Sequence, residues 1–566
     1  MVTIRDLGEY TFPALYNNAI KSFSDCNALS FVDGKPITYA QVAERVENMT
    51  KILYGLNIRE GAKVAIWSGS DPNWGVSYLA LVNLGVIAVP ILPDFSVEEV
   101  ETILRHAGVS GIIISEKMYS KIKHLDSALL PFIIKLEDFS LYRNNEDFEI
   151  PQDYKAVLFS GEIPAATVTE DTIASIIYTS GTTGRSKGVV LTHKNIVFNA
   201  IQCQTVHRIN KRDKCLSFLP LSHVYEFTIG FVMQFLNGAC IYYLGKPPTV
   251  STLLPAFKKI RPTLILSVPI IMEKIYKNKI IPTFSKTKTM KKLYQIRFFQ
   301  KIFHRIAGKS LKRTFGGHLK FFGIGGAKVD TQVEQFMKDA KFPYAIGYGL
   351  TETAPLLAGS GTKNTKPGTI GPILEGVELQ IINPNPETGI GEVVARGPNV
   401  MQGYYNDPEL TAEVFTTDED SCGAGWFKTG DLGDFAVKGY LSLKGRLKNM
   451  ILGSGGENIY PEDIEFVLNQ HPDVLESLVV EDEKGLVALV QLDLEKLAKQ
   501  FKGAVDDMKE AVLYKQEEVL SEIKFYVNQK TSKTSKIGIV KSVSEFEKTA
   551  SQKIKRYLYG KKNSSN

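Results

Sequence analysis

The sequence contains few cysteines and no cysteine pair that could define a scaffold. The five cysteines of the 566-residue chain are scattered and include no C-x-x-C spacing. This pattern argues against a disulfide framework or a zinc ribbon and favours a reducing compartment. The first twelve residues carry charges where a signal peptide would have an apolar run, so we expect a cytoplasmic protein rather than a secreted one.

Uninterrupted hydrophobic runs of membrane-spanning length are also lacking. Residues 72–93 and 227–245 carry no charge and are long enough to be candidates. Each is broken by an asparagine and a glycine, at 83–85 and at 237–238, and then continues into a β-rich run. In both places we expect a buried helix, a glycine turn and a buried strand, as in a parallel α/β sheet.

A strong excess of charge is absent as well. There are 67 Lys and Arg residues against 61 Asp and Glu residues, which gives a formal net charge of +6. A surplus of this size does not indicate a nucleic-acid partner, and we expect none. Hydrophobic residues at 44% and charged residues at 23% are typical of a globular protein, and the length favours two or more domains.

Helix-like and strand-like segments alternate in the N-terminal part of the chain. Residues 37–54 and 97–106 have helical spacing, whereas 63–67 and 111–115 have the composition of strands. This alternation favours a mostly parallel sheet. From about Gly368, glycine, proline and β-type runs dominate, which indicates an antiparallel or barrel-like subdomain.

The most informative stretch is residues 173–190, where an apolar strand ends in a loop of glycines, hydroxyl side chains and a lysine. Glycines let backbone N–H groups turn towards one anion, hydroxyls add donors and the lysine adds charge. The stretch therefore predicts a cradle for a polyphosphate, although the common GxxxxGK[ST] loop is absent. The predicted phosphate-binding residues are Thr179, Ser180, Gly181, Thr182, Thr183, Gly184 and Lys187.

This loop, YTSGTTGRSKGV, resembles the signature of the adenylate-forming (AMP-binding) superfamily, which includes acyl-CoA synthetases. Five further signatures follow in the family's order. They are LPLSHVYE (219–226), GIGGAKV (323–329), YGLTETAP (348–355), GWFKTGDLG (425–433) and KGRLKNMILGSGGENIYPEDIE (444–465). The resemblance extends from Ile37 to about Lys541 and implies an AMP-forming acid–thiol ligase.

The resemblance implies a fold and a division of the chain. We expect an α/β protein whose residues 1–447 form a large N-terminal domain of parallel α/β sheets with a β-barrel-like subdomain, which binds AMP and the acyl group. Residues 448–566 would form a small mobile α+β domain that carries the catalytic lysine. Lys448 stands at the family's hinge position, where one residue must absorb a large change in φ and ψ.

The resemblance also assigns residues to the adenine site. The turn Gly325, Gly326 and Ala327 would line it, because only glycine lets a flat base approach the backbone closely. Tyr348, followed by Gly349, would offer an aromatic face for stacking on adenine, although Tyr348 is open to a second interpretation as a packed core residue.

The phosphates, the metal ion and the ribose have their own predicted residues. Thr351 would donate to the α-phosphate, and Glu352 is a hard oxygen ligand suited to Mg²⁺, together with Thr182. By resemblance, Asp431 would accept hydrogen bonds from the ribose hydroxyls, and Arg446 would lie near the ribose and phosphate.

The catalytic lysine is expected near the C-terminus, where the family pattern resembles PKTxxGK. In NQKTSKTSKIGIVK (528–541) the proline is missing and Ser535 stands in place of the glycine. Lys536 aligns best and is predicted to act at the carboxylate–phosphate junction, while Lys533 and Lys530 are one alignment slip away. In a second state, the face that receives the thiol would consist of Gly453, Ser454, Gly455, Gly456 and Glu457.

The segment LPLSHVYE resembles its counterpart in long-chain fatty acyl-CoA synthetases. His223, Tyr225 and Gly323 would then border the acyl pocket, although His223 also fits a packed core histidine. The implied function uses ATP and Mg²⁺ to convert a long-chain fatty acid to acyl-AMP and pyrophosphate, and then forms a thioester with CoA. An acyl–acyl-carrier-protein synthetase and a fatty acyl-AMP ligase remain alternatives.

One segment concentrates positive charge. Residues 274–313 contain 13 Lys and Arg and no Asp or Glu, so acidic residues outnumber basic ones in the rest of the chain. Within this segment, residues 290–306 have the spacing of one basic amphipathic helix. Its apolar positions are Leu293, Ile296, Phe299, Phe303 and Ile306. Three interpretations stay open: docking at the cytoplasmic face of an anionic membrane, a patch for an acidic acyl carrier protein, or packing of the helix on the body.

Overall fold

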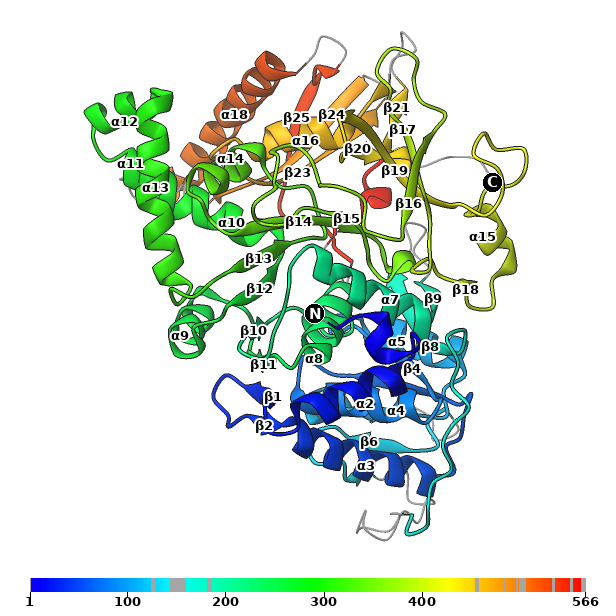
Figure 1. The fold of residues 1–566 in the computed structure, drawn as a ribbon. Helices are drawn as coiled ribbons and strands as arrows, with labels where there is room; N and C mark the ends of the chain where they lie inside the picture. The colour runs from blue at the N-terminus through cyan, green and yellow to red at the C-terminus, as the bar shows by residue number, and fades with distance from the viewer. Residues whose placement is uncertain are drawn as a thin grey trace.

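The fold was analysed in a computed structural model of the chain (Figure 1). The structure describes residues 2–123, 129–142, 159–180, 186–452, 458–482, 485–494, 497, 505–531, 535–549 and 553–560. Within α18, side chains are described from residue 516 onward. The chain folds into two large sheets covered by helices, a smaller antiparallel sheet, and a C-terminal part with its own core.

The first large sheet has eight strands in the order β15-β14-β13-β12-β10-β11-β1-β2. These strands are β1 (Asn27–Phe31), β2 (Ile37–Thr38), β10 (Lys214–Ser217), β11 (Cys240–Tyr243), β12 (Leu264–Ser267), β13 (Phe321–Ile324), β14 (Tyr344–Gly349) and β15 (Leu356–Gly359). All neighbours from β1 to β14 pair in parallel, and only the edge strands β2 and β15 are antiparallel. The carboxyl ends of β12, β13 and β14 therefore meet at one edge.

The second large sheet also has eight strands, in the order β18-β9-β8-β4-β3-β5-β6-β7. They are β3 (Lys63–Trp67), β4 (Ile87–Ile91), β5 (Gly111–Ile114), β6 (Ile133–Lys135), β7 (Leu141–Tyr142), β8 (Ile173–Ser180), β9 (Ser186–Thr192) and β18 (Gly403–Tyr404). The strands from β8 through β4, β3 and β5 to β6 pair in parallel, and β8 forms an antiparallel hairpin with β9. The predicted parallel α/β class is confirmed.

Helices connect and cover these sheets (Figure 1). Those of the first half are α1 (Ile4–Leu7), α2 (Phe12–Phe23), α3 (Tyr39–Gly55), α4 (Pro72–Asn83), α5 (Val97–Ala107), α6 (Glu116–Ile122), α7 (His193–Gln202), the π-helix η3 (Glu226–Val232), α8 (Met233–Leu236) and α9 (Val250–Ile260), with a 3-10 turn η2 (Cys203–Thr205). Those that follow are α10 (Pro269–Ile275), the π-helix η4 (Tyr276–Ile280), α11 (Ile281–Phe284), α12 (Lys288–Gln295), α13 (Arg297–Thr314), α14 (Thr331–Asp339) and α15 (Pro408–Glu413).

The two uncharged segments form helix, turn and strand, as predicted. The first is buried α4, then Gly85 with φ 69°, then β4. The second is η3 and α8, then Gly238 with φ 78°, then β11. Among the described residues, no helix is both long and apolar enough to cross a membrane.

The segment 290–306 does not form the single helix that its spacing predicts. It breaks at Ile296, whose backbone is extended (φ −85°, ψ 116°), and so divides into α12 and α13. The buried side chains of α13 are His304, Ala307, Gly308 and Leu311, which is not the predicted apolar set. The reason is tertiary: the neighbouring helix α14 determines which face of α13 turns inward.

The predicted antiparallel subdomain is a four-stranded sheet in the order β16-β17-β19-β20. Its strands are β16 (Glu378–Ile382), β17 (Gly391–Arg396), β19 (Phe427–Val437) and β20 (Tyr440–Arg446). The C-terminal part follows with a 3-10 turn η6 (Leu447–Asn449), β21 (Ile451–Leu452), β22 (Asn458–Ile459), α16 (Pro461–Asn469), β23 (Val474–Asp482), β24 (Gly485–Leu492), α18 (Val505–Lys530), β25 (Ile539–Val543) and η8 (Arg556–Leu558). Two hydrophobic clusters, both formed only by residues beyond 450, give this part a core of its own.

A buried carboxyl group lies at the start of η3. Glu226 is 1% exposed, and neither of its carboxylate oxygens has a hydrogen-bond partner among the described residues. Gly230 makes room for it, because a Cβ there would lie 2.6 Å from Glu226 Oε1. Burial raises the pKa of Glu226 from 4.5 to about 8. The fold thus holds Glu226 in its neutral form at neutral pH.

Glu226→Gln should therefore stabilise the protein increasingly as the pH rises. Below pH 4.5 the Glu226 carboxyl is protonated in both the folded and the unfolded chain. Above that pH it ionises freely only in the unfolded chain. The free energy of unfolding of the wild type therefore falls as the pH approaches 8. The gain in the free energy of unfolding should reach at least about 1 kcal/mol between pH 5 and pH 8. Urea unfolding across this range measures it, with the exposed Glu375→Gln as control. A gain of equal size at every pH would show that Glu226 is ionised in the fold.

Candidate active site

The predicted phosphate loop joins β8 to β9. Thr179, at the end of β8, pairs with Lys187 at the start of β9. The predicted residues Gly181, Thr182, Thr183 and Gly184, and the side chain of Ser180, lie outside the described residues. The hairpin therefore presents Thr179 and Lys187 at the base of the loop.

Lys187 points into a charged environment. Its ammonium nitrogen lies 5.1 Å from the centroid of the Tyr404 ring. Burial lowers the pKa of Lys187, as does the positive charge of Lys448, whereas Glu352 acts in the opposite direction. These residues come from β9, β18, η5 (Thr351–Thr353) and η6, so the fold brings four distant segments to one place.

Glu352 is held at the carboxyl end of β14 by a tight return of the chain. A Cβ at Gly349 would lie 1.7 Å from the Pro355 carbonyl oxygen, so only glycine fits there. The half-buried Thr351 and Glu352 follow in η5. The Tyr404 hydroxyl donates a 2.9 Å hydrogen bond to Glu352 Oε1, which orients this carboxylate.

Asp431 lies at the centre of the site. It accepts a 2.7 Å hydrogen bond from the Tyr348 hydroxyl and pairs with Arg446, whose Nε lies 2.6 Å from Oδ1. Asp431 and Arg446 face each other across β19 and β20. Burial raises the pKa of Asp431, and the Arg446 charge is the largest opposing influence. Tyr348 is thus both packed in the core and tied to the site by its hydroxyl.

A lysine that the sequence interpretation missed completes this cluster. Lys553 interacts electrostatically with Asp431, Arg446 and Glu352, and its charge also acts on His223. Lys553 is exposed, as Lys536 is; the protein around its ammonium group lowers its pKa through partial desolvation, and Arg446 lowers it further. The described structure therefore places the ammonium group of Lys553 among the residues predicted to bind nucleotide.

The catalytic role of Lys536 stays a prediction, and the structure describes its surroundings. Lys536 is exposed, and Asn528 anchors the next residue, Ile537, through hydrogen bonds of 2.8 and 3.0 Å to its backbone. A second segment, KTASQK (548–553), also fits the family pattern, with Gln552 in place of the glycine and Glu547 in place of the proline. It departs from the pattern at these two positions only, whereas the alignment that ends at Lys536 departs at four.

The chain that carries Lys553 is fixed to the C-terminal core. Lys548 and Ile554 form a β-bridge, and the Lys553 carbonyl accepts a 2.8 Å hydrogen bond from the Thr549 backbone N–H. Three residues further on, Arg556 makes bonds of 2.7 and 2.8 Å to the two carboxylate oxygens of Glu465. Arg556 therefore positions Lys553 relative to the rest of its domain.

The structure brings the predicted acyl-binding residues together. A Cβ at Gly323 would lie 3.1 Å from the Tyr225 hydroxyl, and a Cβ at Gly325 would lie 3.2 Å from its ring. His223 Nδ1 accepts a hydrogen bond from the Tyr225 backbone N–H at 3.2 Å. Burial, aided by the Lys553 charge, lowers the pKa of His223 to about 4. His223 is thus neutral at neutral pH, with its proton on Nε2.

The other predicted residues occupy the same edge or lie outside the description. Gly326, with φ 86°, and Ala327 are exposed in the turn after β13. Lys448 is exposed in η6, at the junction of β20 and the C-terminal part. The predicted thiol-acceptor residues Gly453, Ser454, Gly455, Gly456 and Glu457 lie outside the described residues.

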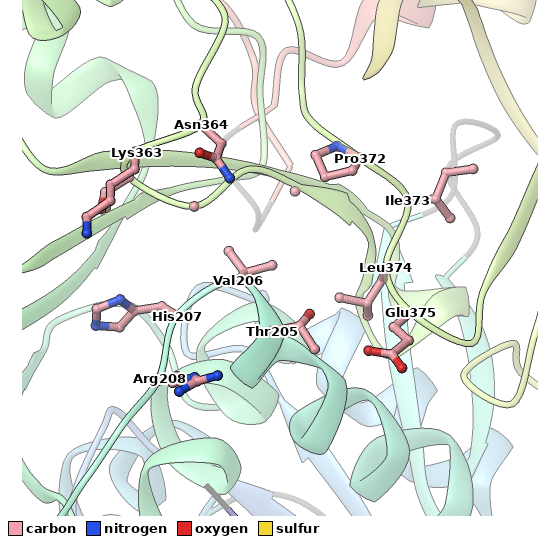
Figure 2. A pocket seen from close by; sticks show the side chains of 13 residues that line it. Thr205, Val206, His207, Arg208, Lys363, Asn364, Pro372, Ile373, Leu374 and Glu375 are labelled. Carbon is pink, nitrogen blue, oxygen red and sulfur yellow. The ribbon is translucent and has the colours of Figure 1, made fainter. Parts of the chain in front are cut away.

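A separate hollow of about 520 Å³ lies near the other end of the first sheet (Figure 2). It is lined by Thr205–Arg208, which precede β10, by residues 359 and 361–364, which end or follow β15, and by residues 372–375. None of the predicted site residues lines it. It is therefore distinct from the cluster at the carboxyl end of β14.

The residues present fit Mg²⁺ held through phosphates. Among the described residues, no group of three His, Cys, Asp or Glu side chains could form a metal cage. Mg²⁺ is usually held by one or two carboxylates together with substrate phosphates and water. Glu352, with one oxygen oriented by Tyr404, supplies such a carboxylate.

Comparison with known proteins identifies the family. The family described as AMP-binding enzyme matches residues 17–405. A long-chain-fatty-acid–CoA ligase, FadD15 of Mycobacterium bovis, is 28% identical over 81% of this chain and 78% of its own. Fatty acyl-CoA synthetase A of Dictyostelium discoideum is 26% identical over 87% of this chain and 77% of its own. The o-succinylbenzoate coenzyme A synthetase of Bacillus subtilis, solved with AMP, covers 96% of this chain and 97% of its own with a TM-score of 0.74 at 22% identity.

The chain belongs to the AMP-binding enzyme family, since the match covers more than half of its length. The predicted class, an AMP-forming acid–thiol ligase, is thereby confirmed, as are its cofactors and co-substrates ATP, Mg²⁺ and CoA.

Tyr404→Phe should raise the Mg²⁺ concentration needed for half-maximal exchange of pyrophosphate into ATP by about tenfold. The variant removes a hydrogen bond to a charged carboxylate, an interaction usually worth about 1.5–3 kcal/mol. The neighbouring Tyr405→Phe serves as control, because it is Tyr404 whose hydroxyl donates to Glu352 in the described structure. Equal Mg²⁺ dependence in the two variants would mean that Tyr404 does not orient Glu352.

Proposed function

We propose that the protein activates a long-chain fatty acid to its acyl-adenylate and transfers the acyl group to CoA. The observation that supports this proposal is the electrostatic interaction of Lys553 with Asp431, Arg446 and Glu352, together with the effect of its charge on His223. Nucleotide-binding residues, a cationic group and the edge of the predicted acyl pocket thereby meet at one point.

In the first step, a carboxylate oxygen of the fatty acid attacks the α-phosphorus of ATP. The new oxygen–phosphorus bond gives acyl-AMP, and the bond to the β-phosphate breaks to release pyrophosphate. No protein nucleophile is required, because the substrate supplies it. Lys553 stabilises the negative charge on the transferring phosphate and the carboxylate, while Thr179, Lys187 and Thr351 bind the phosphates.

The ribose and adenine are held by the central cluster. Asp431 has further lone pairs beyond those used by Tyr348 and Arg446, and these accept from ribose hydroxyls. The turn of Gly325, Gly326 and Ala327 and the ring of Tyr348 bound the adenine. Glu352 and the predicted ligand Thr182 would hold Mg²⁺, which would neutralise phosphate charge.

In the second step, the thiolate of CoA attacks the acyl carbonyl and AMP leaves. For this we propose that residues 448–566 form a domain that rotates about Lys448, withdrawing Lys553 and presenting residues 453–457 to the thiol. A separate C-terminal hydrophobic core supports this division. Such a rotation lets one site serve two reactions.

The long-chain assignment draws on two kinds of support. The relatives named above are described as acting on long-chain fatty acids or as a fatty acyl-CoA synthetase. In this chain, Tyr225 and Gly323 are in contact, and the apolar helix η3 continues from them. An acyl–acyl-carrier-protein synthetase and a fatty acyl-AMP ligase share the first step and differ only in the acceptor.

Lys553→Ala should lower fatty-acid-dependent ATP–pyrophosphate exchange by at least about 100-fold, because it removes a charge that stabilises the transition state. Lys536→Ala is the matched control and should retain nearly full exchange. Transfer from preformed acyl-AMP to CoA should survive in Lys553→Ala, since that step does not use this lysine. If Lys536→Ala loses exchange and Lys553→Ala keeps it, the assignment of Lys553 is wrong.

Incubation with ATP, Mg²⁺ and fatty acids of graded chain length, with either CoA or holo-acyl carrier protein, tests the substrates. We expect acyl-CoA as the product and a maximum of kcat/KM at long chain lengths. Exclusive acylation of the carrier protein would establish the first alternative, and acyl-AMP that accumulates with either thiol would establish the second. A maximum at short or aromatic acids would overturn the long-chain assignment.

A cytoplasmic location with peripheral contact to a membrane completes the proposal. The supporting feature is the basic segment 274–313, which contains 13 Lys and Arg and no Asp or Glu.

A further inference from the structure

The basic segment is part of a long helical connection between neighbouring parallel strands. The chain leaves β12 at Ser267, forms α10, η4, α11, α12 and α13, and returns to β13 at Phe321. The carboxyl end of β12 is next to the predicted acyl site, because Leu266 of β12 pairs with the predicted acyl-binding residue Gly323 of β13. Figure 1 shows α11, α12 and α13 at the edge of the molecule, outside the layers that cover the sheets.

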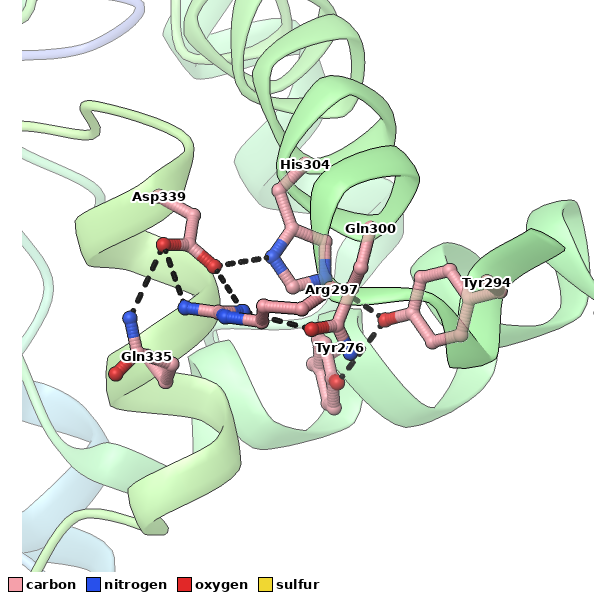
Figure 3. A network of polar contacts seen from close by, with 7 residues as sticks. All are labelled: Tyr276, Tyr294, Arg297, Gln300, His304, Gln335 and Asp339. Carbon is pink, nitrogen blue, oxygen red and sulfur yellow. Dashed lines mark hydrogen bonds and ion pairs between the residues drawn. The ribbon is translucent and has the colours of Figure 1, made fainter.

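One face of α13 is fixed to the body by a polar network (Figure 3). Asp339 at the end of α14 receives hydrogen bonds from Arg297, at 2.7 and 3.0 Å, and pairs with His304 Nδ1 at 3.0 Å. The Tyr294 hydroxyl on α12 lies 2.8 Å from His304 Nε2, and Tyr276 on η4 lies 3.3 Å from Tyr294.

Apolar contacts reinforce this fixed face. Phe303 stacks on Phe284 at 5.1 Å between ring centroids, and Ala307 and Leu311 are buried in the same hydrophobic cluster. His304, Ala307 and Leu311 recur at three- or four-residue spacing and thus lie on one side of the helix. The rotation of α13 about its axis is therefore determined.

The opposite face of α13 carries exposed apolar side chains that belong to no hydrophobic cluster of the described residues. Phe298, Ile302 and Ile306 are spaced by four residues, and 69%, 39% and 58% of their surfaces are exposed. Residues at this spacing lie one above the other along a helix. An aligned ridge of three large exposed apolar side chains is unlike the scattered single ones that a surface ordinarily carries.

Positive charges flank this ridge on the same face. Arg305, Lys309 and Arg313 follow the ridge residues at helical spacing, and all three are exposed. Lys291 and Lys292 on α12 are exposed as well. The whole segment 274–313 contains no acidic residue, so no carboxylate of its own neutralises these cations.

We propose that this face of α13, which we call the α13 ridge (Phe298, Ile302, Ile306 with Arg305, Lys309 and Arg313), docks on an anionic lipid bilayer. An interfacial helix inserts its apolar side chains at the boundary of headgroups and acyl chains while its cations bind lipid phosphates. An acidic protein surface would pair with the cations but would not bury the phenylalanine and isoleucine side chains. A lipid interface accommodates both kinds of side chain.

The docking rests on the geometry of α13 alone, whereas its use depends on the proposed function. Fatty acids partition into bilayers, and the connection from α10 to α13 begins at the acyl-site edge of β12. The docked ridge would hold the acyl-binding edge of the enzyme near the lipid phase that supplies its substrate.

Sedimentation of the full chain with vesicles tests the proposal. The protein should bind vesicles of phosphatidylcholine with phosphatidylglycerol, bind vesicles of phosphatidylcholine alone far more weakly, and dissociate as salt is raised. The triple variant Arg305→Gln, Lys309→Gln, Arg313→Gln should bind about 100-fold more weakly, at about 1 kcal/mol for each charge. The triple variant Phe298→Ser, Ile302→Ser, Ile306→Ser should also lose at least about tenfold, through lost apolar burial.

The control variant carries Lys35→Gln, Lys117→Gln and Lys438→Gln, three exposed lysines in other parts of the fold, and should bind as the wild type does. ATP–pyrophosphate exchange in detergent-free solution should be unchanged in all three variants, which separates failure of docking from failure of the proposed chemistry. Equal binding by wild type and both ridge variants would overturn the proposal. Binding of acyl carrier protein that the ridge variants lose, without vesicle binding, would assign the ridge to that partner instead.

Discussion

The rest of the site depends on the interactions of the buried Asp431 carboxylate. Asp431 is buried, pairs with Arg446 and accepts from Tyr348, and it also attracts Lys553. Removal of a carboxylate from water is costly unless cations and donors replace the water. The protein meets this requirement with groups from β14, β20 and the C-terminal part, so one carboxylate holds together three regions that are far apart in sequence.

In this arrangement, attractive and repulsive electrostatic effects on the Lys553 ammonium group oppose each other. Asp431 and Glu352 attract it, whereas Arg446 repels it and burial disfavours its charge. Two cations beside two carboxylates leave little surplus of either sign. An incoming polyphosphate adds negative charge at this point, so the cations gain a stronger partner only when substrate is present. The electrostatic attraction among these four side chains is therefore weaker without a bound polyphosphate than with one.

Local patterns in the sequence were sufficient for most of the fold. Lys63–Trp67 forms β3 with the predicted bounds, and the uncharged segments became buried helix, turn and strand because glycine at the turn accepts positive φ. Family motifs likewise indicated Asp431, Arg446 and Glu352, which the fold brings together. Their mutual placement could not be inferred from spacing alone.

Two features depend on tertiary structure and could not be predicted from the local sequence: the surroundings of the C-terminal lysines and the inward face of α13. Lys553 and Lys536 both belong to lysine-rich segments, and what distinguishes them is the anchor from Arg556 to Glu465, some ninety residues earlier in the chain. The inward face of α13 depends on Asp339 in another helix, so the predicted apolar stripe did not match the buried one. Periodicity identifies that a helix has two faces, but partners elsewhere decide which face is covered.

Besides the interactions of Lys553, polar contacts link the C-terminal part to the body in the described structure. Lys328 pairs with Asp463 at 2.7 Å, Lys277 donates to the Asn469 carbonyl, and Gln332 reaches Gln470 at 3.4 Å. The first pair is exposed on both sides, and such pairs contribute at most about 1 kcal/mol and weaken with salt. The rotation proposed above would break these polar contacts, so a higher ionic strength would favour the state in which Lys553 is withdrawn.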